Sequence, residues 1–137
     1  EKERKRATIK WLEKVQLGAN YYDRYPHQLS GGQRQRAVIA RALATHPDFL
    51  ICDECVSALD ISTQTQILNL LIDLKREMGL TIIFISHDLE IVKYISDRIM
   101  VMRNGIIEEI GITEDICYNP TSAYTRQLLN AIPKSNF

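Results

Sequence analysis

Two short apolar runs with a helix-like segment between them restrict the fold of this chain more than any other feature. The runs are Phe49-Leu50-Ile51-Cys52 and Thr81-Ile82-Ile83-Phe84-Ile85, and polar residues do not interrupt them. Strands buried on both faces have this character, as in a parallel sheet covered by helices. Between the runs, apolar residues recur at helical spacing from Ile67 to Met78, and Gly79 is a plausible helix stop. This order predicts an α/β fold with a mainly parallel sheet flanked by helices.

The segments before and within this unit carry further helix signals. Residues 8–16 have an apolar stripe at helical spacing, which predicts a helix that stops at Gly18. A second helix is predicted after residues 30–33 and ends before Pro47. The helix between the two apolar runs is predicted to use Ser62 as its N-cap.

The segments after the second run predict a hairpin and two short helices. Asn104-Gly105 favours a tight turn between strands at 99–102 and 106–107, because both residues tolerate positive φ. The hairpin would form an antiparallel edge of the sheet. Residues 113–115 form an acidic helix start, and Asn119-Pro120 break that helix. The last helix carries Tyr124, Leu128 and Ile132 four residues apart.

Composition limits the classes of partner. The 137 residues contain 17 basic and 17 acidic side chains, so no global basic field exists to hold nucleic acid or coat an anionic membrane. We therefore expect no nucleic-acid partner. No apolar run approaches the roughly 18 residues that span a bilayer, and the charged start is unlike a signal peptide, so we expect a cytoplasmic protein. Three cysteines outside a disulfide-dense setting favour reduced thiols.

Ser30-Gly31-Gly32-Gln33 is a candidate anion site. Two glycines allow the backbone to come close to a ligand, and the helix that follows would direct its first N–H groups and positive dipole end towards it. A glycine turn before a helix without any ligand is the commoner situation when such a pair stands alone. The interpretation therefore depends on the other motifs in the chain.

Polar residues follow each of the two predicted buried strands. Asp53 and Glu54 end the first, where parallel sheets bind ligands, and in nucleotide hydrolysis one carboxylate could hold Mg²⁺ while its neighbour orients the attacking water. His87 follows the second strand and would lie beside them if the strands are neighbours, within reach of a phosphate oxygen. A solvated acidic pair and a structural histidine are the alternatives when each is taken alone.

Taken together and in order, four motifs resemble the ABC ATPase family. They are Leu29-Ser30-Gly31-Gly32-Gln33, Phe49-Leu50-Ile51-Cys52-Asp53-Glu54, Ser57-Ala58-Leu59-Asp60 and Ser86-His87-Asp88. In that family these are the signature motif, the Walker B strand with its glutamate, the D-loop and the switch histidine. The resemblance covers almost the whole chain and implies the P-loop NTPase fold of the ABC ATPase type.

The resemblance also implies site roles and partners. Two ATPase subunits would form a head-to-tail dimer around two ATP molecules, with Ser30-Gly31-Gly32-Gln33 contacting the γ-phosphate held by the opposite subunit. Asp53 would hold Mg²⁺ through water, and Glu54 would be the general base. His87 would steady the γ-phosphate, and Asp60 would couple the two sites. The cofactors implied are thus ATP and Mg²⁺.

The tail narrows the resemblance to importers of oligopeptides, dipeptides or nickel. Asn119-Pro120 and the tyrosine, leucine and proline pattern of residues 123–133 are similar to their C-terminal extension, although Ser122-Ala123 stands where that group commonly has His-Pro. The implied domains are the end of the helical subdomain (1–46), a catalytic core (47–110) and the extension (111–137). The implied function is the ATP-hydrolysing subunit of a peptide importer, peripheral at the cytoplasmic face of the membrane through permease subunits.

The chain also departs from the family pattern. No stretch matches the glycine-rich P-loop that ends in Gly-Lys-Ser/Thr. We therefore expect a truncated C-terminal portion that does not hydrolyse ATP alone and whose apolar strands are incompletely covered.

Cys55 replaces the usual proline or alanine and forms a C-x-x-C with Cys52. A metal or redox role needs more ligands or a thioredoxin-like setting, so coincidence is the preferred interpretation.

Three alternative functions stay open at this point. They are the ATPase of a nickel importer, a non-transport ABC ATPase that acts on DNA or ribosomes, and a catalytically silent remnant. The tail favours import, and Glu54 and His87 are both present, which argues against long decay.

Overall fold

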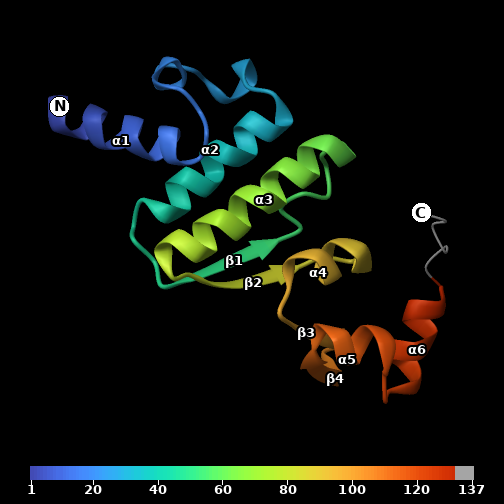
Figure 1. Cartoon of the computed structure of the whole chain (residues 1–137). Helices are drawn as coiled ribbons and strands as arrows, with labels where there is room; N and C mark the ends of the chain where they lie inside the picture. Colours follow the sequence, from blue (N-terminus) through green and yellow to red (C-terminus); the bar gives the residue numbers. More distant parts are fainter. Residues whose placement is uncertain (132–137) are drawn as a thin grey trace. The chain divides into compact units, whose positions relative to one another are not determined.

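The computed structural model describes residues 1–131 and divides into two compact units, Glu1–Ile85 and Ser86–Phe137 (Figure 1). The first unit runs α1 (Lys2–Lys14), two 3₁₀ turns η1 (Ala19–Tyr21) and η2 (Pro26–Gln28), α2 (Gly31–Leu43), β1 (Phe49–Asp53), α3 (Ile61–Met78) and β2 (Thr81–Ile85). The second runs α4 (Leu89–Ile95), β3 (Arg98–Arg103), β4 (Ile106–Ile112), α5 (Thr113–Tyr118) and α6 (Ala123–Asn130). The α/β fold class predicted from the sequence is confirmed.

The core of the first unit forms around α3. This helix packs on α2, which in turn packs on α1, and it lies alongside the β1–β2 pair (Figure 1). Its apolar stripe supplies the buried residues Ile67, Leu68, Leu70, Leu71 and Leu74. Val15 and Leu43 are fully buried as well, so all three helices of the unit contribute to one core.

The ends of α3 are fixed by two local devices. Asp60, not Ser62, is the N-cap, because its carboxylate accepts the Thr63 N–H at 2.9 Å and the Thr63 hydroxyl at 2.6 Å. The predicted N-cap was therefore wrong by two residues. At the other end Gly79 takes φ +67°, the left-handed conformation that closes many helices, which confirms the predicted stop.

The first helix ends earlier than predicted. Gln16, not Gly18, takes the left-handed conformation, with φ +61°. The N–H of Gln16 donates to the Glu13 carbonyl at 2.9 Å, and the N–H of Leu17 donates to the Leu12 carbonyl at 2.8 Å. This is a Schellman motif, in which Leu17 becomes buried after the turn. The burial of Leu17 gives a physical reason for a non-glycine residue in this conformation.

The two strands of the first unit are parallel neighbours in register from Phe49↔Thr81 to Asp53↔Ile85. One face of the pair lies under α3, and Cys52 on that face is buried. The other face carries Phe49, Ile51, Ile83 and Ile85, which are between 45% and 60% exposed. The helices of the unit cover one face alone, which agrees with the expectation that the apolar strands of this chain are incompletely covered.

The second unit is a hairpin covered by short helices. β3 and β4 pair antiparallel, and the turn residues Asn104 (φ +50°) and Gly105 (φ +79°) both have positive φ, as predicted. Within residues 1–131 this hairpin is a separate two-stranded sheet, not the edge of the parallel pair that the sequence suggested. The tight turn lets the two strands satisfy each other's backbone groups locally, so their pairing does not require a neighbour in another sheet.

One face of the hairpin holds the core of the second unit. Ile99 and Val101 of β3 are buried against Ile116 of α5. Val92, Cys117, Tyr124 and Leu128 pack around them. The predicted helix start at 113–115 and the break at Asn119 are confirmed, while Ile132 of the predicted last helix lies outside the described residues.

A carboxylate ties the segment before α6 to the hairpin. Glu109 of β4 accepts the N–H and the hydroxyl of Thr121, both at 2.7 Å, and the Ser122 N–H at 3.1 Å. The side chain of Thr125 and these donors lower the pKa of Glu109 to about 2. The carboxylate therefore fixes the entry to α6 in its ionised form.

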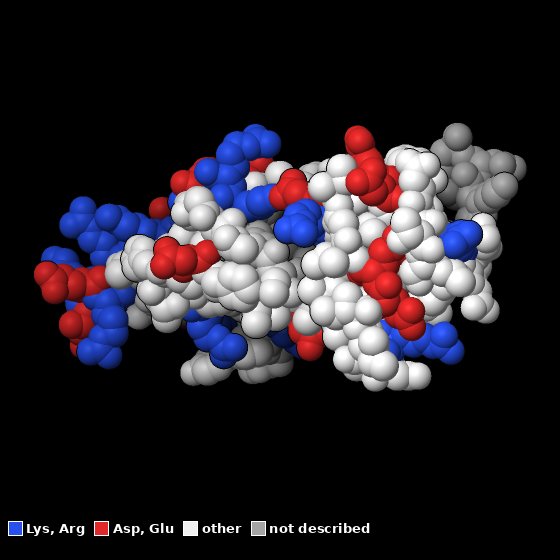
Figure 2. Space-filling view, turned by 90° about the horizontal axis from the view of Figure 1, so that it is seen from below, with Lys and Arg blue, Asp and Glu red and all other residues white. Residues whose placement is uncertain are grey.

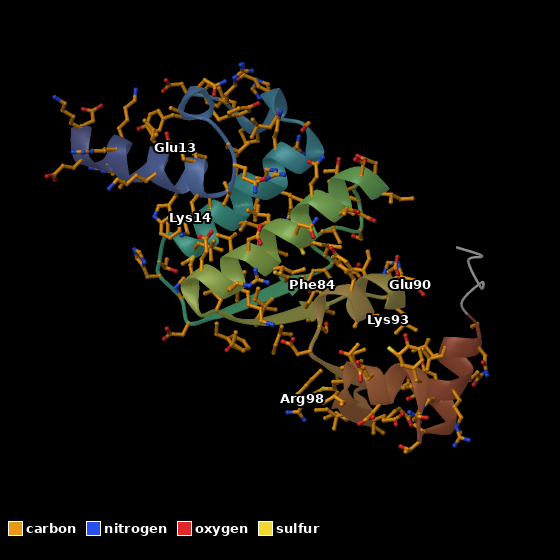
Figure 3. All side chains as sticks on the ribbon, in the orientation of Figure 1. Glu13, Lys14, Phe84, Glu90, Lys93 and Arg98 are labelled. Atoms are coloured by element: carbon orange, nitrogen blue, oxygen red, sulfur yellow. The ribbon has the colours of Figure 1, made fainter. Side chains whose placement is uncertain are left out.

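Figure 2 shows Lys, Arg, Asp and Glu side chains on one face of the described residues. On the face shown in Figure 2, basic and acidic groups crowd together around α1, whose first residues are exposed as predicted. Lys14, labelled in Figure 3, lies at the end of α1. Its Nζ donates to the carboxylate of Glu77 in α3 at 3.1 Å. Among the described residues, no helix combines the length and the apolar content needed to cross a bilayer.

Candidate functional site

The glycine motif begins α2 with a capping box. The Ser30 hydroxyl accepts the Gln33 N–H at 3.3 Å, and the Gln33 side chain accepts the Ser30 N–H at 3.0 Å. Gln33 also donates through Nε2 to the Tyr21 hydroxyl at 3.0 Å. The N–H groups of Gly31 and Gly32 occupy the first turn, where no carbonyl of the same helix precedes them. The helix start is therefore rigid and presents donors suited to an anion.

The structure adds a packing reason for the two glycines. A Cβ on the buried Gly32 would collide with the Thr63 methyl group, and a Cβ on Gly31 would come to 3.0 Å from Leu59 Cδ2. Leu59 and Thr63 flank Asp60, the N-cap of α3. The starts of α2 and α3 are thus in contact, so the predicted signature residues and Asp60 lie in one region of the first unit.

Asp60 performs a structural task in this region. Its two carboxylate oxygens hold the side chain and backbone of Thr63, and these hydrogen bonds lower the pKa of Asp60. The group is exposed, so the capping does not bury it. Its role in coupling two subunits, implied by the resemblance, stays a prediction.

The acidic pair Asp53 and Glu54 lies where β1 ends. Glu54 adopts φ +48°, a left-handed conformation that is unusual for glutamate. Its N–H donates to the Ile85 carbonyl at 3.0 Å, and its carbonyl accepts the Ser57 hydroxyl at 2.9 Å. The ends of both strands therefore hold the turn, with the Asp53 side chain exposed and Glu54 half-buried.

The donors at this strand end fit Mg²⁺. An exposed carboxylate such as Asp53 can bind this cation directly or through water, because Mg²⁺ keeps several waters and often takes one or two protein carboxylates. Among the described residues, no group of three or more His, Cys, Asp or Glu side chains forms a complete metal cage. Magnesium at this strand end would therefore take further oxygen ligands from water and nucleotide phosphates.

His87 belongs to the second unit. It is exposed and stands between β2 and α4. Next to it, Asp88 caps α4 by accepting the N–H groups of Glu90 and Ile91, and its own N–H donates to the Ser86 hydroxyl at 3.1 Å. The condition for the prediction holds, because β1 and β2 are parallel neighbours. The approach of His87 to Asp53 and Glu54 stays a prediction.

Sequence reasoning missed two contacts of this region. The contact of Gly32 with Thr63 joins residues 31 positions apart, and the hydrogen bond of Gln33 to Tyr21 joins α2 to η1 across 12 positions, so no short-range signal could have found either.

Comparison with known proteins extends these observations. The family described as ABC transporter matches residues 1–57. The chain is 53% identical over 133 residues to the dipeptide transport ATP-binding protein DppF of Haemophilus influenzae, covering 97% of this chain and 41% of that protein. It is 52% identical over 132 residues to the oligopeptide transport ATP-binding protein OppF of Bacillus subtilis, covering 96% and 43%. The chain therefore spans less than half the length of these curated relatives.

Solved structures agree with the sequence matches. The ADP conformation of an ATP-binding cassette of an ABC transporter superposes with a TM-score of 0.76 at 31% identity, covering 89% of this chain and 49% of that one. An inward-facing structure described as a metal-chelate type ABC transporter gives a TM-score of 0.79 at 30% identity, covering 93% and 49%. Both the fold and the sequence therefore confirm the predicted resemblance of this chain to the ATPase domains of ABC transporters.

Proposed function

We propose that this chain is part of the ATPase subunit of an ABC importer that couples ATP hydrolysis to the uptake of peptides across the cytoplasmic membrane. The observation that carries this proposal is the 53% identity to a dipeptide transport ATP-binding protein over 97% of the chain. The match covers 97% of the chain and so includes most of the tail, whose residue pattern also resembles the C-terminal extension of peptide importers. Dipeptides and oligopeptides are the substrates that the names of the relatives favour.

The end of β1 is the proposed hydrolytic centre. Asp53 would hold Mg²⁺ through water, and the bound ion would neutralise negative charge on the phosphate oxygens of ATP. Glu54, held by backbone bonds to Ile85 and Ser57, would orient the attacking water and accept its proton. His87 would donate to the γ-phosphate. The rigid turn supports this assignment because a general base must be positioned before its pKa matters.

The starts of α2 and α3 are the proposed contact with a second ATPase subunit. Residues 30–33 would contact the γ-phosphate of ATP bound by that subunit, using the first N–H groups of α2. Asp60 would transmit the state of one site to the other. The contact of Gly32 with Thr63 supports this pairing of roles, because it makes the two helix starts one structural element.

The larger assembly follows from the same proposal. The subunit would bind transmembrane permease subunits and lie at the cytoplasmic face of the membrane as a peripheral protein. The proposed divisions are residues 1–46 as the end of the helical subdomain, 47–110 as the catalytic core and 111–137 as the importer extension.

The central test replaces Glu54 in the intact protein that contains this chain. Glu54→Gln should keep MgATP binding but slow turnover by about 100-fold to 10,000-fold, the range typical of a lost general base. Glu108→Gln, in β4, is the matched control and should leave both properties unchanged. Sustained hydrolysis by Glu54→Gln would remove the assigned base, and failure of the wild-type protein to bind MgATP would overturn the proposed function.

The substrate is tested separately by transport. Cells or vesicles with the wild-type subunit should accumulate a labelled dipeptide or oligopeptide in an ATP-dependent manner, and the Glu54→Gln subunit should abolish this uptake. ATP-dependent accumulation of Ni²⁺ without peptide uptake would reassign the transporter while leaving the ATPase proposal intact.

A further inference from the structure

The hydroxyl of Tyr21 reaches the start of α2 from a part of the chain outside the four motifs. Tyr21 is the last residue of η1, and its hydroxyl accepts a hydrogen bond from Gln33 Nε2 at 3.0 Å. Both side chains are half-buried, so the bond is partly shielded from water. A tyrosine in such a place combines an apolar ring that packs with a polar tip that holds a partner. The bond therefore links a residue without an assigned role to one of the proposed signature residues.

Two contacts on one face of α2 hold the segment that carries Tyr21. Gln33 and Arg36 are three residues apart on this helix, so their side chains lie on the same face. One nitrogen of the Arg36 guanidinium donates to the Val15 carbonyl at 3.0 Å and to the Gln16 side chain at 2.8 Å. The chain from residue 15 to residue 21 is therefore fixed to α2 at both of its ends.

The short turn η1 fixes the direction from which Tyr21 approaches. The Tyr21 N–H donates to the Gly18 carbonyl at 3.1 Å, which closes the 3₁₀ turn. On the next residue, the centroid of the Tyr22 ring lies 4.7 Å from Lys5 Nζ of α1. The turn is therefore held by α1 through Tyr22 and by α2 through the Tyr21 hydroxyl.

The two ends of the Gln33 side-chain amide have different partners. Its Oε1 accepts the Ser30 N–H at 3.0 Å, whereas its Nε2 donates to the Tyr21 hydroxyl. An amide turned by half a revolution would place the Nε2 donor against the Ser30 N–H, and the bond to Ser30 would be lost. The bond to Tyr21 restrains the amide at its other end, and so disfavours rotamers of Gln33 that leave the Ser30 N–H without its acceptor.

We propose that Tyr21 is a positioning residue for ATP hydrolysis, because its hydroxyl holds the Gln33 amide in the orientation that completes the capping box of α2. The inference rests on the proposed function, in which residues 30–33 contact the γ-phosphate of ATP on the opposite subunit. With the amide held, the first turn of α2 has its shape before that phosphate arrives, so less free energy is lost in ordering it. Tyr21 acts through Gln33 and not on the nucleotide.

The first experiment measures the start of α2 without ATP. In the intact protein that contains this chain, Tyr21→Phe keeps the ring but removes the hydroxyl, and NMR would follow the exchange of the Ser30 and Gln33 amides. Their protection should fall about twofold to tenfold, the range expected for one hydrogen bond. Tyr22→Phe is the matched control, because it removes the neighbouring hydroxyl and leaves the ring beside Lys5, and it should leave both amides unchanged. Unchanged protection in Tyr21→Phe would overturn the proposal.

A double-mutant cycle separates positioning from packing. Gln33→Ala removes the side-chain amide, while the N–H of residue 33 can still donate to the Ser30 hydroxyl, as it does at 3.3 Å in the structure. Tyr21→Phe should then cause no further loss of protection at residue 33, because the group that it restrains is absent. An equal loss with and without the Gln33 amide would show that Tyr21 acts through the packing of η1, which contradicts the proposed role.

The last experiment connects this positioning to hydrolysis. At saturating MgATP, Tyr21→Phe should lower kcat about twofold to tenfold in the otherwise unchanged protein and cause no further fall in the Gln33→Ala protein. The Kd of the dilute subunit for MgATP should stay the same, because residues 30–33 serve the nucleotide of the other subunit.

Three results would overturn the role of Tyr21 in hydrolysis. They are an unchanged kcat in Tyr21→Phe, an equal fall of kcat with and without the Gln33 amide, and a weaker Kd for MgATP that accounts for the slower turnover. Absence of hydrolysis in the unsubstituted protein would instead contradict the proposed function, and the amide exchange would still decide whether Tyr21 positions Gln33.

Discussion

The β1–β2 pair and the β3–β4 hairpin are both two-stranded sheets, but their strands are joined in different ways. Each has two strands, one face buried under helices and one face that remains about half exposed, with Ile51 and Ile83 in the first pair and Met100 and Ile110 in the second. The hairpin is joined by a two-residue turn, whereas the parallel strands are joined through the 18 residues of α3. Parallel pairing therefore depends on the packing of a helix, and antiparallel pairing depends mainly on a turn.

The largest expected effect tests the dependence of the parallel pair on α3. Leu71 is fully buried in the middle of that helix, so Leu71→Ala should lower the free energy of unfolding of the first unit by about 2–5 kcal/mol through lost contacts and a cavity. Urea denaturation followed by the fluorescence of Trp11, the single tryptophan and part of α1, would measure it. Ile61→Ala, at a position 82% exposed on the same helix, is the control and should change little.

Substitution of one glycine in each connection allows the two connections to be compared directly. Gly79 ends α3 at φ +67° and Gly105 turns the hairpin at φ +79°, and a Cβ at either position would meet no atom within 4 Å. Alanine at each position should therefore cost about 1–2 kcal/mol through backbone strain alone. Hydrogen exchange should show faster opening of β1 and β2 in Gly79→Ala and of β3 and β4 in Gly105→Ala. Faster opening of the other strand pair, or equally faster opening of all four strands, would mean that the two connections do not act locally.

A smaller effect depends on pH and is confined to the second unit. Because the pKa of Glu109 is lowered to about 2 in the folded protein from an ordinary 4.5, the unfolded state binds this proton more readily. The stabilisation is therefore present above pH 4.5 and is lost as the pH falls towards 2. The protection of the amides of residues 121–130, that is, their exchange rate relative to the intrinsic rate at each pH, should fall across this window. Glu109→Gln should show lower protection already at neutral pH and no such titration.

The smallest effect is expected at the ion pair between α1 and α3. Lys14 and Glu77 are 3.1 Å apart, but their side chains are 34% and 60% exposed to solvent, so Lys14→Ala should change stability by no more than about 1 kcal/mol. The change should vanish in high salt, because salt screens exposed charges. A larger loss that persists in high salt would show that the stem of Lys14 matters through packing.

Local sequence signals predicted those parts of the fold that local geometry determines. The Asn104-Gly105 turn and the Gly79 stop were predicted because each needs a positive φ that the residue type supplies. The N-cap of α3 was misplaced because Asp60 and Ser62 are both good caps, and the choice depends on which side chain reaches the Thr63 N–H. The exposed face of the parallel pair was expected from the missing P-loop segment and not from the apolar runs themselves, since an apolar strand does not reveal how many of its faces are covered.

The features of the candidate site also separate into those that local sequence signals predict and those that depend on distant contacts. A helix after residues 30–33 was predicted, but the Ser30 cap, which starts α2 already at Gly31, was not. The contact of Gly32 with Thr63 depends on how two distant helix starts pack, and spacing alone carries no information on it.

The left-handed backbone at Glu54 has a further meaning for stability. Asparagine tolerates that conformation far better than glutamate does, so a Glu54→Asn protein would relieve local torsional strain while it loses the longer carboxylate. If this variant is less active but melts at a higher temperature, glutamate at position 54 serves activity at a cost in stability. Its side chain is needed for function, whereas its backbone conformation is unfavourable for this residue type.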